Sequence, residues 1–288
     1  MNQEDLNSWE EFKEHLEIIQ KETQKLKANP HKVGMVSEPL YRGQPNHKWH
    51  LESTLERKYK NMTLFQYFGI LERIKPIVER ISNISWPTFS DIGGFQLESV
   101  YHFVNMLPNN SLGYITLLRQ HGFPSPLLDW TSCPNIASYF AFERIDVNTE
   151  RVAIYFFREQ TGLSTNLKNA LNPTMNSIGH NIDQTSQRHY KQKTQYTICL
   201  KKLDIRDNLG HYIISNMEED INNPGYDLND DFSEADPEGG NVVRKYTIPT
   251  TESKKVLREL ESKGICRASL FEGTLDNMLI DLWNKYGM

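Results

Sequence analysis

The sequence predicts an α+β fold with a helical layer at its N-terminus. An apolar stripe with helical spacing opens the chain, and runs rich in β-branched and aromatic residues, typical of strands, follow later. The 288 residues contain no internal repeat and no linker that clearly divides them. We therefore expect residues 1–37 to form an amphipathic helix packed on the body, and residues 38–288 to form one compact unit.

The N-terminal helix is predicted over residues 4–28. Ser8 and Glu11 have the spacing of a capping box, and Asn29-Pro30 ends the pattern. The residues that recur at helical spacing and are expected to face the body are Leu6, Trp9, Phe12, Leu16, Ile19 and Leu26.

The first half of the body contains strands and helices separated by turn-rich segments. Pro134 is well placed to start a helix, because proline suits the first helical position. The expected strands lie at 38–43 and within 123–131, and the expected helices at 63–82, 96–106, 111–121 and from Pro134 to 143.

The second half of the body is richer in strands. We expect strands at 151–157, 193–200 and 242–249, a weaker strand at 211–216, and helices at 251–263 and 274–286. Residues 159–190 are polar and predict a long loop or a set of short helices. Residues 217–240 carry nine acidic residues and no Lys or Arg, which favours a solvated excursion.

Composition excludes several classes of protein. No apolar run approaches the length of a membrane span, and the net charge of −5 argues against nonspecific nucleic-acid binding by the whole surface. The three cysteines lie far apart, so we expect no disulfide framework and a reduced, cytoplasmic setting. His47 and His50 lack a third ligand in sequence, and an acidic calcium-loop pattern over 227–238 has Phe232 where glycine is required, so no metal site is expected.

Four short motifs occur in order along the chain. They are Tyr41-Arg42-Gly43-Gln44; Gln120-His121-Gly122-Phe123-Pro124 followed by Leu127-Leu128-Asp129-Trp130-Thr131; Arg188, Gln192 and Tyr196 before a strand; and Gly264-Ile265 followed by Ser269-Leu270-Phe271. In this order they resemble the bacterial FRG-domain family over roughly residues 38–280. Where that family usually has Thr-Arg, this chain has Ser125-Pro126, so a cation expected at the site is missing.

The same motifs have a weaker similarity to the ADP-ribosyltransferase fold, which implies split antiparallel sheets and NAD as cofactor. Tyr41-Arg42-Gly43 resembles the first element of that fold, and Asp129-Trp130-Thr131 with Ala137 and Phe140 resembles the second. Gln192 to Tyr196 stands at the third, where the usual catalytic glutamate is absent.

The resemblances imply a nucleotide site with two groups of residues. Asp129 and Gln192 are the catalytic candidates, and the cofactor-binding candidates are Arg42, Gly43, Gln44, His121, Trp130, Thr131, Arg188 and Tyr196. Arg42 and Arg188 offer cations for phosphate, and Trp130 or Tyr196 offers a ring for stacking.

Most of these residues also have a structural explanation, which the sequence leaves open. Arg42 is a candidate ion-pair partner of Asp129, and Asp129 or Thr131 a candidate helix cap. Trp130 is a candidate core residue, and His121 a candidate helix C-cap.

Three functions follow from these candidates. The first is ADP-ribosyl transfer from NAD to a protein or nucleic-acid acceptor, in a toxin or phage-defence role. The alternatives are a non-catalytic module that binds a nucleotide, a nucleic acid or a protein, and a nuclease-like hydrolase using Arg188, His121 and Asp129. No membrane partner is expected.

Overall fold

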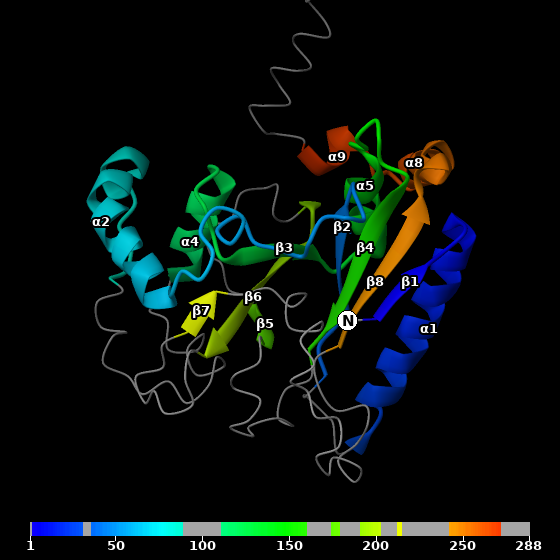
Figure 1. The fold of residues 1–288 in the computed structure, drawn as a ribbon, viewed down its shortest axis with the longest axis horizontal. Coiled ribbons are helices and arrows are strands. Elements are labelled where there is room, and N and C mark those ends of the chain that lie inside the picture. Colours follow the sequence, from blue (N-terminus) through cyan, green and yellow to red (C-terminus); the bar gives the residue numbers. More distant parts are fainter. Residues whose placement is uncertain are drawn as a thin grey trace, which may run out of the picture.

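The computed structural model describes residues 2–30, 36–88, 111–159, 174–178, 191–202, 212–214 and 242–271. These residues form an α+β fold, as predicted, built on a mixed eight-stranded sheet (Figure 1). The strand order is β1-β8-β4-β2-β3-β6-β5, and β7 also pairs with β6.

The strands are β1 (Asn2–Asp5), β2 (Leu40–Gln44), β3 (Leu127–Thr131), β4 (Arg151–Arg158), β5 (Thr174–Ile178), β6 (Thr194–Lys202), β7 (Tyr212–Ile214) and β8 (Val242–Pro249). The α-helices are α1 (Trp9–Lys27), α2 (Leu64–Ser82), α4 (Ser111–Gln120), α5 (Pro134–Phe142), α8 (Ser253–Ser262) and α9 (Arg267–Phe271), and a short 3-10 helix, η4 (Thr250–Glu252), precedes α8.

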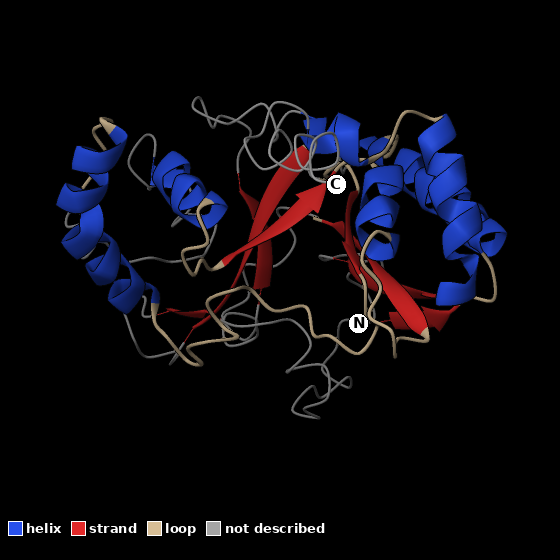
Figure 2. Ribbon diagram, turned by 90° about the horizontal axis from the view of Figure 1, so that it is seen from above, coloured by secondary structure: helices blue, strands red, loops and turns tan. Residues whose placement is uncertain are grey.

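The sheet has two halves with separate helical covers. We call β1, β8, β4 and β2 the first half, and β3, β6, β5 and β7 the second half. One apolar cluster joins α1, α5, α8 and α9 to the first half, and another joins α2 and α4 to the second half. Figure 2 shows these two groups of helices on opposite sides of the molecule.

The two halves meet at a single residue pair. Tyr41 of β2 pairs with Thr131 of β3, whereas β2 pairs with β4 along its whole length from Leu40 to Gln44. The prediction of two split antiparallel sheets is therefore wrong as stated. The described strands form one connected sheet, and β1 is parallel to β8. The strands β2 and β3 nevertheless separate beyond their one pair, which opens the sheet at its centre.

The N-terminal helix packs on the body as predicted, but it begins later. Ser8 adopts an extended conformation and its Oγ accepts a hydrogen bond from the backbone N–H of Glu11 at 3.2 Å, so the helix starts at Trp9. The residues before this cap form β1 instead of a first helical turn. The ring of Trp9 is fully buried, and its Nε1 donates to Glu259 of α8 at 2.7 Å.

Several other elements differ from the sequence prediction. The strand β5 lies within 159–190, where a loop or short helices were expected, because pairing with β6 supplies its backbone hydrogen bonds. The short helix α9 was not predicted. The predicted helices at 96–106 and 274–286 and the acidic segment 217–240 lie outside the described residues.

Candidate functional site

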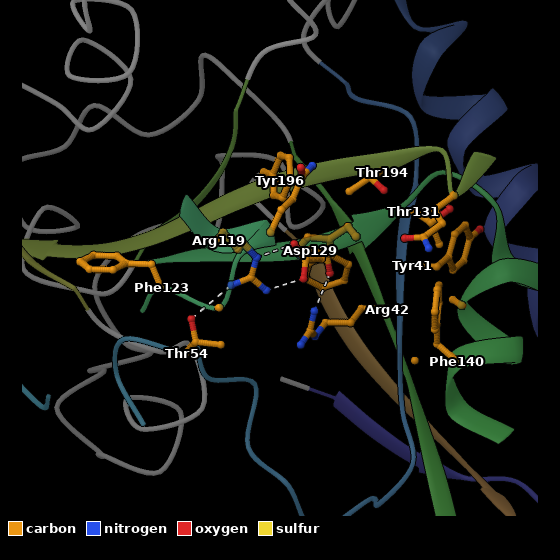
Figure 3. A pocket seen from close by; sticks show the side chains of 16 residues that line it. Tyr41, Arg42, Thr54, Arg119, Phe123, Asp129, Thr131, Phe140, Thr194 and Tyr196 are labelled. Carbon is orange, nitrogen blue, oxygen red and sulfur yellow. Dashed lines mark hydrogen bonds and ion pairs between the residues drawn. The ribbon is translucent and has the colours of Figure 1, made fainter. Parts of the chain in front are cut away.

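A pocket of about 420 Å³ lies where β2 and β3 separate (Figure 3). Its volume falls in the range of roughly 300–1,000 Å³ that is usual for small-molecule sites. The residues that line it are Tyr41, Arg42, Gly43, Thr54, Arg119, Gln120, Gly122, Phe123, Asp129, Trp130, Thr131, Ala137, Phe140, Gln192, Thr194 and Tyr196.

Arg42 bridges the gap between the two strands. Its Nη1 donates to the backbone carbonyl of Asp129 at 2.7 Å, a carbonyl that β2 no longer reaches through its backbone. Its Nε is buried without a hydrogen-bond partner, and no carboxylate of the described residues forms an ion pair with it. Burial lowers the pKa of Arg42 to about 10, although the nearby Asp129 carboxylate opposes this shift. No ion pair with a described acid therefore neutralises the positive charge of Arg42.

Asp129 is held by a different arginine, which the sequence analysis missed. Arg119 Nε donates to Asp129 Oδ1 at 2.6 Å, and Arg119 Nη2 forms a second, short bond to Oδ2 (Figure 3). The Arg119 side chain is 11% exposed, whereas the Asp129 side chain is 45% exposed toward the pocket. Burial disfavours the charge on Arg119, but the ion pair outweighs it and raises the pKa of this guanidinium.

Arg119 places a cation at the pocket, although Ser125-Pro126 stands where a cation was expected from the resemblance. It also donates from Nη1 to Thr54 Oγ1 at 3.3 Å, so that its guanidinium group is hydrogen-bonded to both Asp129 and Thr54. Its position in the last turn of α4, directly before Gln120-His121-Gly122, was the signal available in the sequence. The hypothesis that Arg42 is the ion-pair partner of Asp129 is replaced by this pair.

The end of α4 explains why the second motif contains His121-Gly122. Gly122 has a φ of 81°, and its N–H donates to the carbonyl of Arg119 at 3.0 Å, while the N–H of Phe123 donates to Leu118 at 2.9 Å. These two bonds form a Schellman cap, which glycine favours. His121 is exposed at this cap and is not among the described residues that line the pocket, an arrangement that favours the capping interpretation over cofactor binding.

Gly43 is required for packing between β2 and α5. A Cβ atom at this position would lie 1.9 Å from the carbonyl oxygen of Ala137 and 2.6 Å from the backbone nitrogen of Ala141. The glycine and the two alanines therefore allow the strand and the helix to approach closely. Gly43 still borders the pocket, but helix packing, not contact with a ligand, accounts for it.

Two other predicted binding residues, Trp130 and Gln44, are buried. Trp130 is among the residues that line the pocket, but its ring is 3% exposed, packs against Phe157 and donates from Nε1 to Thr197 Oγ1 at 2.7 Å, so most of it belongs to the core. Gln44 is buried outside the pocket and donates to the carbonyl of His50 at 3.2 Å. Arg188 lies outside the described residues.

The remaining candidates do line the pocket. Thr131 Oγ1 accepts from the N–H of Cys133 at 3.1 Å and so fixes the turn before α5. Gln192 donates from Nε2 to the carbonyl of Leu270 at 3.3 Å, which links the start of β6 to α9. Tyr196 pairs in register with Asp129 and is 4% exposed, and burial raises the pKa of its hydroxyl.

Two partly buried phenylalanines also line the pocket and were not among the predicted site residues. Phe123 follows the cap of α4, and Phe140 lies on α5, where it meets Phe271 edge to face at 6.1 Å. In Figure 3 they stand at opposite ends of the pocket, with Arg119, Asp129 and Arg42 between them.

Searches for other kinds of site gave negative results within the described residues. No group of three or more His, Cys, Asp or Glu side chains there is arranged to hold a metal ion. None of the helices described is both long enough and apolar enough to cross a membrane.

Together the fold and the pocket define an α+β protein with a polar, arginine-bearing site at the centre of its sheet. Residues 37–150 match the family model of the FRG domain, so this part of the chain is similar to FRG domains. The match covers Arg42, Arg119 and Asp129 and confirms the resemblance for the first two motifs, whereas the third and fourth motifs lie beyond residue 150 and stay a prediction. No curated protein and no solved structure matches the chain, so the similarity to ADP-ribosyltransferases stays a prediction.

Proposed function

We propose that the pocket binds a phosphate-bearing nucleotide, that NAD is this nucleotide, and that the protein transfers ADP-ribose from it. The observation that carries the proposal is the Arg42 guanidinium, which borders the pocket without a carboxylate partner among the described residues. Arginine is suited to phosphate because its planar fork donates two parallel hydrogen bonds.

The balance of charge in the pocket supports an anionic ligand. Arg42, Arg119 and Asp129 are the charged residues among those that line it. Because Arg119 and Asp129 neutralise each other, Arg42 leaves an excess positive charge in a chain whose net charge is −5. A phosphate or pyrophosphate would complement that charge.

The aromatic residues support a ligand with a ring on each side of its phosphates. Phe140 and Phe123 lie at opposite ends of the pocket, with the charged side chains between them (Figure 3). Planar rings stack favourably on such side chains. We therefore assign a stacking role to Phe140 and Phe123.

The proposed reaction breaks the bond between the ribose carbon and the nicotinamide nitrogen. The electron pair leaves with nicotinamide, and a nucleophile of a protein or nucleic-acid acceptor bonds to the same carbon and loses its proton. Asp129 is the anion nearest to the positive charge that develops on the ribose, and the Gln192 amide is the group to orient a ribose hydroxyl. Such a reaction suits a cytoplasmic toxin or phage-defence protein.

Binding is tested by isothermal titration of the full chain with NAD, ADP-ribose and AMP. We expect Arg42→Gln to weaken binding of all three at least tenfold, since it removes a charge-assisted hydrogen bond to phosphate. Arg258→Gln on α8, an exposed arginine outside the pocket, is the matched control and should change nothing. Equal affinities of the two variants, or no binding of any nucleotide, would overturn the proposal.

A second candidate is binding without catalysis, and one observation favours it. Asp129 is the only acid among the described residues that line the pocket, and both of its oxygens are bonded to Arg119. Release of free nicotinamide from NAD, with and without cell extract as acceptor, separates the two candidates. Release that Asp129→Asn abolishes supports transfer, whereas binding without release supports a nucleotide-binding module.

A further inference from the structure

We propose that the basic loop, residues 45–60, is a docking surface for single-stranded nucleic acid. This loop follows β2 and leads toward α2, and every residue in it is described. The inference goes beyond nucleotide binding in the pocket and does not depend on it.

The exposed charges of the basic loop are mostly positive. Lys48, Arg57, Lys58 and Lys60 are exposed. Of its two acids, Glu52 is partly exposed, whereas Glu56 is 6% exposed and its Oε2 accepts from the N–H of Ser53 at 2.8 Å. The loop therefore presents a local excess of positive charge, although the whole chain has a net charge of −5. Clusters of this kind attract a phosphate backbone.

Two exposed aromatic residues lie next to these charges in the sequence. Trp49 is 44% exposed beside Lys48, and Tyr59 is 53% exposed between Lys58 and Lys60. The other tryptophans of the described residues are buried, at 5% exposure or less. Aromatic faces among cations are the arrangement on which unpaired bases stack, and bases in a duplex are not available for this. The aromatic residues thus select a single strand over a duplex.

Hydrogen bonds hold the basic loop beside the pocket. Tyr155, which pairs with Arg42 across β4 and β2, donates from its hydroxyl to the carbonyl of Trp49 at 3.2 Å. Thr54 lines the pocket and accepts from Arg119. Burial, together with the charges of Arg119 and Arg57, lowers the pKa of Arg42, so Arg57 lies within electrostatic range of the site. A strand bound on the loop would therefore lie near the pocket.

The first test measures binding of the full chain to fluorescein-labelled single strands of about 15 nucleotides, oligouridine and oligothymidine, by anisotropy. Arg57→Glu with Lys58→Glu should weaken binding at least tenfold. The slope of log affinity against log salt should also fall by about 0.7 for each phosphate that the protein no longer neutralises. Lys254→Glu with Arg258→Glu, a matched pair of exposed cations on α8, should stay within twofold of the unchanged chain.

The second test concerns the aromatic contribution. Trp49→Leu should weaken single-strand binding about fivefold and Trp49→Phe should restore it, while a duplex of the same sequence binds at least fivefold more weakly than the single strand. Equal binding of duplex and single strand, with no effect of Trp49→Leu, would overturn the proposal in favour of charge alone. Absence of oligonucleotide binding at low salt would also overturn it, whether or not NAD binds in the pocket.

Discussion

In the first half of the sheet, β4 and β8 pair at eight positions, whereas the two halves are joined by the single pair Tyr41–Thr131. Each half also brings one arginine to this junction. Arg42 belongs to β2 of the first half and reaches a backbone carbonyl, while Arg119 comes from the helix that covers the second half and binds the Asp129 carboxylate. The junction is weak in backbone pairing and rich in side-chain charge.

The two arginines show how the partner of a residue decides its role. Burial lowers the pKa of Arg42, but the ion pair with Asp129 raises the pKa of Arg119 despite its burial. The charge of Arg119 is thus neutralised within the second half by its ion pair with Asp129, whereas Arg42 has no carboxylate partner among the described residues.

Gly43→Ala should break the first half of the sheet at the junction. The added Cβ would collide with the backbone of α5 at Ala137 and Ala141, and a backbone clash is not relieved by a rotamer change. We expect the free energy of unfolding to fall by about 3 kcal/mol or more, measured by denaturant unfolding.

Gly69→Ala within α2 is the matched control, because nothing lies within 4 Å of its added Cβ. That variant should gain about 0.5–1 kcal/mol from helix propensity. Similar effects of the two changes would contradict the packing role of Gly43.

Arg119→Met should destabilise the second half by about 2 kcal/mol, less than the loss of a fully buried pair because Asp129 is partly exposed. The comparison with Asp129→Asn and the double variant gives the coupling energy of the pair. We expect the double variant to be no less stable than Arg119→Met alone. Strictly additive losses would show that the two side chains do not stabilise each other.

Glu259 makes the first half sensitive to acid. Burial opposes its charge, but hydrogen bonds from Lys263, Trp9 and Lys13 outweigh burial and lower the pKa of Glu259 to about 2. Because the folded pKa lies below the ordinary glutamate value of 4.5, this stabilisation is complete above about pH 4.5 and is lost as the pH falls toward 2.

The variant that tests this is Glu259→Gln, which should cost roughly 1 kcal/mol at neutral pH. The difference in Tm between it and the unchanged chain should shrink between about pH 4.5 and pH 2. A difference that is constant with pH would refute the assignment. Glu261→Gln on the same helix, an exposed acid that makes none of these hydrogen bonds, should show no such dependence.

The elements predicted correctly are those with local signals. The strand β8 matches its predicted bounds of 242–249 because the β-branched run and its flanking residues define it locally, and α5 begins at Pro134 as expected. The strands β1 and β5 were missed because their sequences, Asn-Gln-Glu-Asp and Thr-Met-Asn-Ser-Ile, lack an apolar pattern. Both exist through pairing with a strand that is distant in sequence, which no local pattern predicts.

The candidate site was predicted in part for a similar reason. Asp129, Arg42 and Gln192 were found from motifs, but the partner of Asp129 depends on how α4 packs, so Arg119 was missed. Trp130 lines the same pocket as Asp129, but the burial of its ring and its hydrogen bond to Thr197 depend on how β3 packs against its neighbours, which the motif alone does not reveal.

The smallest effect on stability is expected at Arg42, which sharpens its contrast with Arg119. Arg42→Met removes one hydrogen bond to the Asp129 carbonyl, but it also removes a buried charge whose Nε has no partner. These contributions have opposite signs, so the free energy of unfolding should change by less than about 1 kcal/mol.

The measurement is denaturant unfolding of Arg42→Met beside Arg119→Met, the same substitution at both arginines. A loss at Arg42 as large as that at Arg119 would mean that Arg42 holds the two halves together, and its charge would then be structural. A small loss, combined with weakened nucleotide binding, would mean that the charge serves a ligand.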